Sequence, residues 1–380
     1  MDDLTTNTGL DLRAEALVTH FEGAGYRRAA PPLLQPAEPF LDLSGEDIRR
    51  RMYLTSDAEG HELCLRPDLT IPVARAYLSS PAAGEAAGFC YLGPVFRQRG
   101  SQSGEFLQAG IESFGRKDRA AADAEMLTLG LEACAHYGIE APDICMGDVA
   151  LFSGLIATLD LAPAWKRRLV KDFNRKADLA SDLDQLVRDA ARGRPQYQGV
   201  LAALAGSDPA AAHALVTDLL SISGISALGG RSVDEIADRF LEQAALGATS
   251  GIPGEVRSLI ERFLAISGDP DEAAAELRAL AGDSGTALDS VIDLFESRTG
   301  FLAARGVDVS RIRFATALGS GWEYYSGLIF QLHEQGEQDR PLVAGGRYDA
   351  MLARLGSQTP IPAVGFAVWI DRLSNIGSVV

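Results

Sequence analysis

Residues 106–114 read Phe-Leu-Gln-Ala-Gly-Ile-Glu-Ser-Phe, and this stretch decides the fold class. Side chains of a strand point alternately to opposite faces of a sheet. Three apolar side chains therefore share one face, which we expect to pack on helices: Leu107, Ala109 and Ile111. The other face carries an amide, a bare backbone and a carboxylate, at Gln108, Gly110 and Glu112. That face suits a pocket floor, where glycine lets a ligand approach closely, and it equally suits the solvated outer face of an antiparallel sheet.

Further strands are predicted on both sides of this stretch. Residues 88–97, 324–332 and 363–370 are aromatic and β-branched, and Pro94 indicates an irregular or edge position in the first of them. The glycines of 344–347 indicate a turn that leads into a helix over 348–355, and another helix begins near Asp371. Regular alternation of strand and helix is missing, so the sequence predicts an α+β fold with an antiparallel sheet flanked by helices.

The middle of the chain is rich in Ala, Leu, Asp and Arg and predicts helices. Trp165, Leu169 and Phe173 recur every fourth residue as one apolar stripe. Asp269 before Pro270 is a helix start, because the carboxylate can cap the first turn and proline needs no donor there. We therefore expect a discontinuous domain of residues 1–150 and 306–380, interrupted by a mainly helical insertion over 151–305.

Composition excludes several classes of protein. The 380 residues are 47 % hydrophobic and 23 % charged, which is globular, and no apolar run approaches the roughly 20 residues of a membrane span. The acidic start lacks a signal-peptide pattern, so a cytoplasmic protein is expected. A net charge of −17 disfavours nucleic acid. The scattered Cys and His residues give no metal-site spacing, and neither a P-loop nor a Rossmann motif occurs, so no metal or cofactor is expected.

Ordered blocks over most of residues 10–150 and 310–375 resemble histidyl-tRNA synthetases, which are class II aminoacyl-tRNA synthetases. The blocks are Gly25-Tyr26 with Pro32, LRPDLT at 65–70, GPVFR at 93–97, Gln108 with Glu112, GWEYY at 321–325, GGRYD at 345–349, and 365–373. The resemblance implies the class II fold, a dimer interface at the first block, and a histidine site. It implies that the amino group and imidazole are held by Asp68, Thr70, Gln108 and Glu112, and that Tyr324 and Tyr325 line the imidazole pocket. Arg97 and Arg372 match residues that contact ATP in the family.

Four departures weigh against synthetase chemistry. Ser320 stands where the family has an arginine that stabilises charge during adenylate formation, and a missing group of that kind commonly costs several hundredfold in rate. Glu105 stands in place of a basic residue in a shortened loop, and Asp68 replaces a longer glutamate. The sequence ends at Val380 without a counterpart of the anticodon-binding domain, so tRNA is not an expected partner.

With these departures the chain resembles a paralogous family, the ATP phosphoribosyltransferase regulatory subunits of histidine biosynthesis. The resemblance implies a non-catalytic chain that a short catalytic subunit requires for activity and for feedback inhibition by histidine. It also implies a hetero-octamer built on dimers of this chain, with Arg97 and Arg372 as remnants of a nucleotide site. Two alternatives remain open: an adenylate-forming enzyme similar to histidyl-tRNA synthetase, and a scaffold subunit whose pocket is vestigial.

Overall fold

The computed structural model describes residues 12–43, 46–100, 103–173, 175–192, 209–222, 252–319, 323–337 and 339–376, with the single residues 233, 236, 237 and 241. Its contacts divide the chain into two compact units. Unit 1 comprises residues 1–154 and 263–380, and unit 2 comprises residues 155–262. Two helices carry the chain between the units, α6 (Val149–Thr158) and α12 (Gly254–Ala265).

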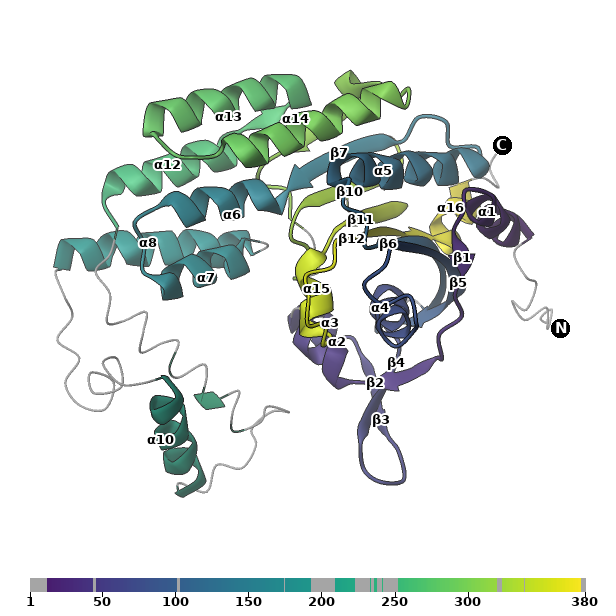
Figure 1. Ribbon diagram of the computed structural model, residues 1–380, viewed down its shortest axis with the longest axis horizontal. Helices are drawn as coiled ribbons and strands as arrows, with labels where there is room; N and C mark the ends of the chain where they lie inside the picture. The colour runs from purple at the N-terminus through teal and green to yellow at the C-terminus, as the bar shows by residue number, and fades with distance from the viewer. Residues whose placement is uncertain are drawn as a thin grey trace. The chain divides into compact units, whose positions relative to one another are not determined.

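Unit 1 is built on a nine-stranded sheet of order β1-β5-β6-β12-β11-β10-β7-β9-β8 (Figure 1). Its strands are β1 (Arg27–Arg28), β5 (Ala87–Phe96), β6 (Glu105–Phe114), β7 (Asp143–Asp148), β8 (Ser267–Gly268), β9 (Ile312–Ala315), β10 (Leu328–His333), β11 (Val343–Arg347) and β12 (Ala363–Trp369). The run from β5 to β7 is antiparallel, whereas β1 joins β5 and β9 joins β7 in parallel. The predicted antiparallel sheet is confirmed.

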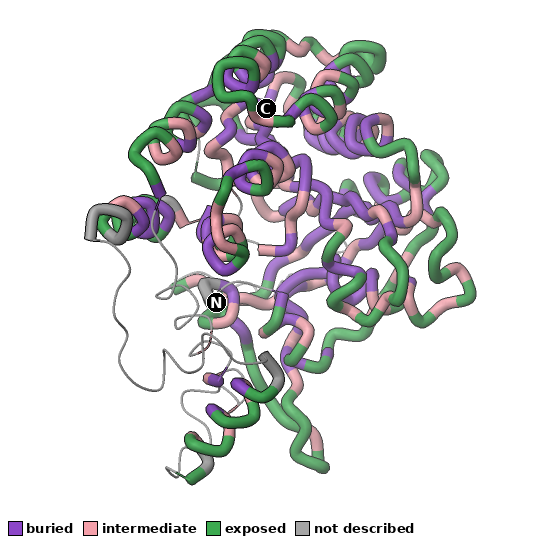
Figure 2. The backbone as a smooth tube through the Cα atoms, turned by 60° about the vertical axis from the view of Figure 1, so that its left-hand side comes forward, coloured by how far each residue is buried: buried purple, intermediate pink, exposed green. Residues whose placement is uncertain are grey.

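Helices cover both faces of this sheet. The helices of unit 1 are α1 (Leu12–Gly23), α2 (Glu38–Leu43), α3 (Glu46–Arg49), α4 (Thr70–Leu78), α5 (Arg119–His136), α13 (Pro270–Ser284), α14 (Asp289–Ala304), α15 (Asp349–Arg354), α16 (Ile370–Ile376) and the 3-10 turn η1 (Val309–Arg311). Figure 1 shows α1 and α5 on one face, with α14 and α13 continuing that layer, and α4 and α15 on the opposite face. The strands between the layers are largely buried, while the helices expose their outer surfaces (Figure 2).

The predicted alternation along β6 is confirmed on the face that packs against α1 and α5. Ala109 and Ile111 are fully buried there, and Phe366 of β12, directly opposite Ile111, meets Phe21 of α1 edge-on at 5.8 Å between ring centroids. The opposite face is buried too, because Phe114 stacks on Tyr77 of α4 at 4.5 Å. The alternative of a solvated outer face is therefore wrong, and β6 is enclosed on both sides.

A small three-stranded sheet lies beside α4, in the order β2-β4-β3. Its strands are β2 (Leu34–Pro36), β4 (Glu62–Leu65) and β3 (Tyr53–Ser56). Cys64 of β4 joins one hydrophobic cluster with side chains of α2, α4 and α15. That cluster closes the second face of the main sheet around the polar residues described below.

Two local predictions are wrong. The glycines of 344–347 form no turn, because Gly345 and Gly346 pair within β11 with both neighbouring strands. The predicted strand over 324–332 begins only at Leu328, so Tyr324 and Tyr325 precede it. Both tyrosines line one cavity, and consecutive residues of a strand point to opposite faces, so a strand could not place them there.

The helical predictions hold where the structure tests them. Unit 2 contains α7 (Pro163–Asp172), α8 (Lys176–Arg192) and α10 (Pro209–Ile222), and the stripe Trp165, Leu169 and Phe173 is buried. Asp269 caps α13, since its carboxylate accepts hydrogen bonds from the backbone nitrogens of Asp271 and Glu272. Among the described residues no helix is long and apolar enough to cross a bilayer.

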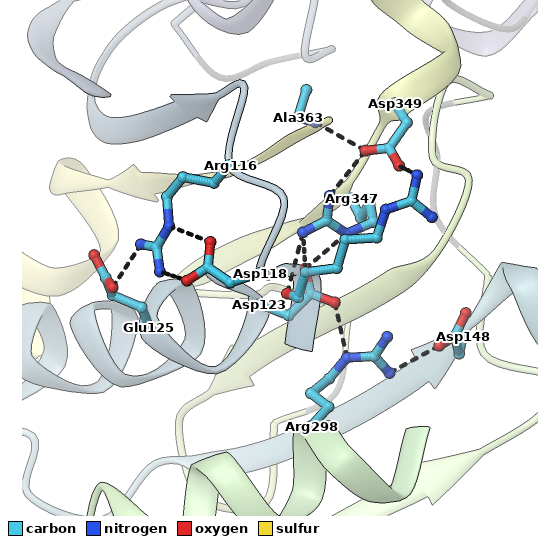
Figure 3. A network of polar contacts seen from close by, with 10 residues as sticks. Arg116, Asp118, Asp123, Glu125, Asp148, Arg298, Arg347, Asp349 and Ala363 are labelled. Atoms are coloured by element: carbon cyan, nitrogen blue, oxygen red, sulfur yellow. Dashed lines mark hydrogen bonds and ion pairs between the residues drawn. The ribbon is translucent and has the colours of Figure 1, made fainter. Parts of the chain in front are cut away.

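A buried ion-pair network ties the layer of α5 and α14 to the sheet (Figure 3). Asp123 of α5 contacts two guanidinium groups, Arg298 of α14 at 2.9 Å and Arg347 of β11 at 2.6 Å. Arg298 also reaches Asp148 of β7 at 2.8 Å, and Arg347 reaches Asp349 at 2.9 Å. Arg347 is thereby fixed on the α5 face of the sheet.

Candidate functional site

A cavity of about 270 Å³ opens on the face of the main sheet that faces α4 and α15. Five of the predicted histidine-binding residues line it: Asp68, Thr70, Gln108, Tyr324 and Tyr325. The sixth, Glu112, is fully buried one shell deeper, where Thr70 and Tyr348 connect it to the cavity wall. Arg97 and Arg372 line the same cavity. The structure thus brings together the six predicted histidine-binding residues with Arg97 and Arg372.

Glu112 occupies the centre of a hydroxyl cluster. Thr70 donates to its Oε1 at 2.6 Å and Tyr91 donates to the same oxygen at 3.2 Å, while Tyr348 donates to Oε2. Burial nevertheless raises the pKa of Glu112 to about 8, because desolvation outweighs the three donors. An uncharged Glu112 can therefore gain a charge when a cationic group arrives beside it.

Asp68 and Gln108 present unused hydrogen-bonding atoms. One oxygen of Asp68 accepts the backbone N–H of Ile71 at 3.1 Å at the start of α4, and the other finds no partner among the described residues. Gln108 is 1 % exposed, and within the part of the chain that the structure describes neither its amide oxygen nor its nitrogen is paired. Burial also raises the pKa of Asp68 to about 6. Buried polar atoms are normally satisfied, so these three atoms indicate a ligand.

Three tyrosine rings form one wall. The ring centroids of Tyr324 and Tyr325 lie 4.9 Å apart, and Tyr348 lies 5.7 Å from the first and 6.4 Å from the second. Their contacts are tilted or edge-to-face, which is the favourable arrangement for aromatic rings. This wall suits a flat ring that carries polar nitrogens.

Guanidinium groups also line the cavity. Arg97 donates from Nε to the carbonyl of Pro67 at 2.7 Å. Arg372 donates to the carbonyl of Pro341, stacks on Trp369 at 4.8 Å, and keeps a buried Nε without a partner among the described residues. Burial lowers the pKa of Arg372 to about 10, so the group remains a cation at neutral pH. The cavity therefore offers carboxylates and cations to one ligand.

Four glycines of the sheet make room for this polar cluster. An added methyl group would lie 1.8 Å from the Glu112 carboxylate at Gly365, 2.4 Å from the Tyr91 hydroxyl at Gly110, 2.4 Å from Arg66 at Gly93, and 2.9 Å from the Tyr325 ring at Gly346. The expectation that Gly110 admits a ligand directly is therefore wrong, because the hydroxyl of Tyr91 fills that space. Glycine serves here to seat protein side chains.

Sequence reasoning missed three side chains in and around the site: Tyr348, which lines the cavity, and Tyr91 and Arg66, which lie outside its lining. Tyr91 lies opposite Gly110 across the β5–β6 pair, Tyr348 follows β11, and the guanidinium of Arg66 lies against Gly93. The signal was present for Tyr348 and Arg66, which stand in the GGRYD and LRPDLT blocks. The contact of Tyr91 with this cluster can be recognised only once the register of β5 and β6 is known.

Ser320, the position that replaces the family's arginine, lies outside the described residues, as do Gly321 and Trp322. Among the residues that are described, no group of three or more His, Cys, Asp or Glu side chains could hold a metal ion. The described side chains form a binding cavity that contains both carboxyl and guanidinium groups.

Sequence comparison relates the chain to known proteins. A family model described as histidyl-tRNA synthetase matches residues 10–238 and 211–373. An ATP phosphoribosyltransferase regulatory subunit of Brucella canis is 40 % identical over 348 residues, which cover 91 % of this chain and 92 % of the relative, and one from Brucella suis matches equally.

Solved structures share the fold. The chain resembles an ATP phosphoribosyltransferase regulatory subunit/histidyl-tRNA synthetase from Bacillus halodurans C with a TM-score of 0.67 and 20 % identity, covering 96 % of this chain and 78 % of that one. A histidyl-tRNA synthetase from Nostoc sp. PCC 7120 gives a TM-score of 0.61 at 17 % identity, over 99 % and 75 % of the two chains. The expected class II fold is confirmed, and the chain belongs to the histidyl-tRNA synthetase-like family of ATP phosphoribosyltransferase regulatory subunits, the non-catalytic members of an enzyme complex.

Proposed function

We propose that this chain binds free histidine in the cavity and transmits its concentration to a short catalytic ATP phosphoribosyltransferase subunit. In this proposal the catalytic subunit needs the chain for activity, and histidine bound in the cavity inhibits the complex. The complex is a cytoplasmic hetero-octamer built on dimers of this chain, and tRNA takes no part in it.

One observation carries the proposal: Gln108 and Asp68 hold buried polar atoms that lack partners among the described residues. Leaving such atoms unpaired costs free energy, and a ligand that pairs with them recovers it. Carboxylates accept from an ammonium group and from ring N–H groups, and hydrogen bonds of this kind are charge-assisted. Asp68 and Glu112 therefore suit the cationic parts of an amino acid, while Arg97 and Arg372 suit its carboxylate.

Imidazole fits the remaining features of the cavity. The three tyrosines give a wall for a flat ring, and Glu112 lies behind Thr70 and Tyr348, both of which line the cavity. An aliphatic amino acid would leave these polar groups unpaired, and a site built for hydrogen bonding rejects such ligands strongly.

The first experiment is calorimetry of the purified chain with histidine. We expect saturable binding by the wild type and at least about tenfold weaker binding by Gln108→Ala and Glu112→Gln. The first variant removes a buried polar partner, and the second replaces a carboxyl group that can become charged beside a cationic ligand with a neutral amide. Gln335→Ala is the matched control, since Gln335 is an exposed glutamine that donates to the carbonyl of Ala141. Equal affinity in all four proteins would contradict the proposed site.

The second experiment measures feedback in the reconstituted complex with the catalytic subunit. Gln108→Ala and Glu112→Gln should assemble normally and support activity, while inhibition requires more histidine than in the wild-type complex. An effector must favour one state through differential contacts, so weaker binding has to weaken inhibition. Unchanged inhibition in both variants would show that the cavity is not the sensor.

The same proteins and assays distinguish the proposed function from two others. An adenylate-forming enzyme is favoured by the retention of Arg97 and Arg372 in the cavity, and it would exchange pyrophosphate into ATP when histidine is supplied. A scaffold with a vestigial pocket would activate the catalytic subunit yet bind no histidine. The proposal expects binding without exchange.

A further inference from the structure

The cavity face of β6 continues beyond Gln108 to Phe106. Glu112, Gln108 and Phe106 share one face of the strand because side chains alternate. Trp369 of β12 lies directly opposite Gln108, so the chain that follows it, at the start of α16, reaches the level of Phe106. Gln108 lines the cavity, and Phe106, which is buried to 6 % exposure, is the next residue of the same row beyond it.

Two guanidinium groups cover this ring. The Cζ atom of Arg99 lies 3.8 Å from the centroid of Phe106, and that of Arg97, which also lines the cavity, lies 5.4 Å away. Arg99 is held in place from two sides, by Asp371 of α16 at 3.5 Å and by the carbonyl of Ser103 at 3.1 Å. The short contact to the ring is one that a flat group makes when it lies over an aromatic face.

We infer that Arg99 is a specificity-determining residue that closes the Phe106 end of the cavity. This inference rests on the proposed binding of histidine. Arg97 borders both the cavity and Phe106, so a ligand extended from its carboxylate end would meet the ring of Phe106 next. The planar cation of Arg99 already occupies that aromatic face, and its ion pair with Asp371 holds it there. The cavity consequently accepts a free amino acid and excludes one that carries a second flat ring on its carboxyl group.

The test compares two ligands, L-histidine and L-histidine β-naphthylamide, whose aromatic amide adds such a ring. We expect wild-type protein to prefer histidine strongly. In Arg99→Ser the preference for histidine, measured as the ratio of the two affinities, should fall by about tenfold or more, as a change in pocket shape allows. The affinity for histidine itself should stay within about threefold of the wild-type value. Arg278→Ser is the matched control, because Arg278 is an ion-paired arginine on α13 with contacts to Asp293 and Glu296.

Two further variants test whether the flat shape of Arg99 and its ion pair with Asp371 matter. Arg99→Lys retains the charge without the flat group, so it should lower the preference for histidine less than Arg99→Ser does. Asp371→Asn should also lower that preference, because it releases Arg99. An unchanged ratio in Arg99→Ser, or equal weakening of both ligands, would overturn the role of Arg99 while leaving the histidine site intact. Absence of histidine binding by the wild type would overturn the proposed function and, with it, this inference.

Discussion

Glu112 combines complete burial with a raised pKa, and both follow from its place under the cavity. Three hydroxyl groups donate to its carboxylate, yet they compensate only part of the lost hydration. The charged form is therefore costly in the absence of a ligand. That cost makes the residue responsive to a cation and also makes it sensitive to pH.

We predict a pH-dependent stability that Glu112→Gln removes. An ordinary glutamate has a pKa of 4.5, whereas that of folded Glu112 is about 8. Between these values the unfolded chain has lost the proton and the folded chain retains it, so the free energy of unfolding falls as pH rises, by at most about 1.4 kcal/mol per pH unit. Urea unfolding at pH 5, 6.5 and 8 should show the wild type losing stability relative to the variant, and parallel curves would refute the prediction.

Gly365→Ala is predicted to disrupt the site. Its methyl group would lie 1.8 Å from a Glu112 oxygen and 2.5 Å from the carbonyl oxygen of Ile111, so the carboxylate must leave its three donors. Overpacking of this kind costs about 1–3 kcal/mol, and histidine affinity should fall as well. Gly282→Ala on α13 has open space and should not destabilise the protein. Thermal unfolding and calorimetry of the two variants distinguish them.

Helices and strands are predicted correctly from the sequence wherever a local pattern of residues determines them. The alternation of β6 and the Asp269-Pro270 helix start are local, and the structure has both. Tyr324 and Tyr325 look like strand residues by composition, but the cavity requires both rings on one side. The glycines of β11 look like a turn, but they accommodate neighbouring side chains in a paired strand. Tertiary packing overrides local preference in both cases.

The Asp269 cap is predicted to contribute to the stability of the protein through α13. Asp269→Ala removes the acceptor for the backbone nitrogens of Asp271 and Glu272, which should lower the free energy of unfolding by about 1 kcal/mol. Asp269→Asn preserves an acceptor oxygen and should remain close to the wild type. Denaturant unfolding of the three proteins provides the measurement, and equal loss in both variants would assign the effect to charge.

For the molecule as a whole, the ion-pair network of Figure 3 joins the layer of α5 and α14 to the sheet around Asp123. Arg347 ends β11 inside this network, and the next residue, Tyr348, donates to Glu112 on the opposite face of the sheet. Sequence reasoning gave no hint of the network, because the pairs that Arg298 and Arg347 make with Asp123 and Asp148 span 150 to 224 residues along the chain. The candidate site was more accessible, since its residues stand in recognisable blocks.

Asp123→Ala is predicted to be among the most destabilising single changes. It leaves Arg298 and Arg347 buried with fewer partners, and breaking a buried pair in this way costs about 3–5 kcal/mol. Arg278→Ala, which removes exposed ion pairs, should have little effect. Urea unfolding measures both. We also expect weaker histidine binding by Asp123→Ala, because Tyr348 follows Arg347 directly; a variant with full affinity would show that the two faces are independent.

The pairing of β6 with β12 sets the order of events during synthesis. Glu112 lies opposite Gly365, so β6 can pair with β5 early but must wait for its other neighbour, β12, until residues 363–369 have been synthesised. Asp123 and Asp148 emerge long before Arg298 and Arg347 can neutralise them, and water must solvate both acids in the nascent polypeptide. Folding that depends on such distant contacts is slow. The edge of β6 that will pair with β12 therefore stays unpaired while the intervening residues are translated, and chaperones have a long interval in which to engage it.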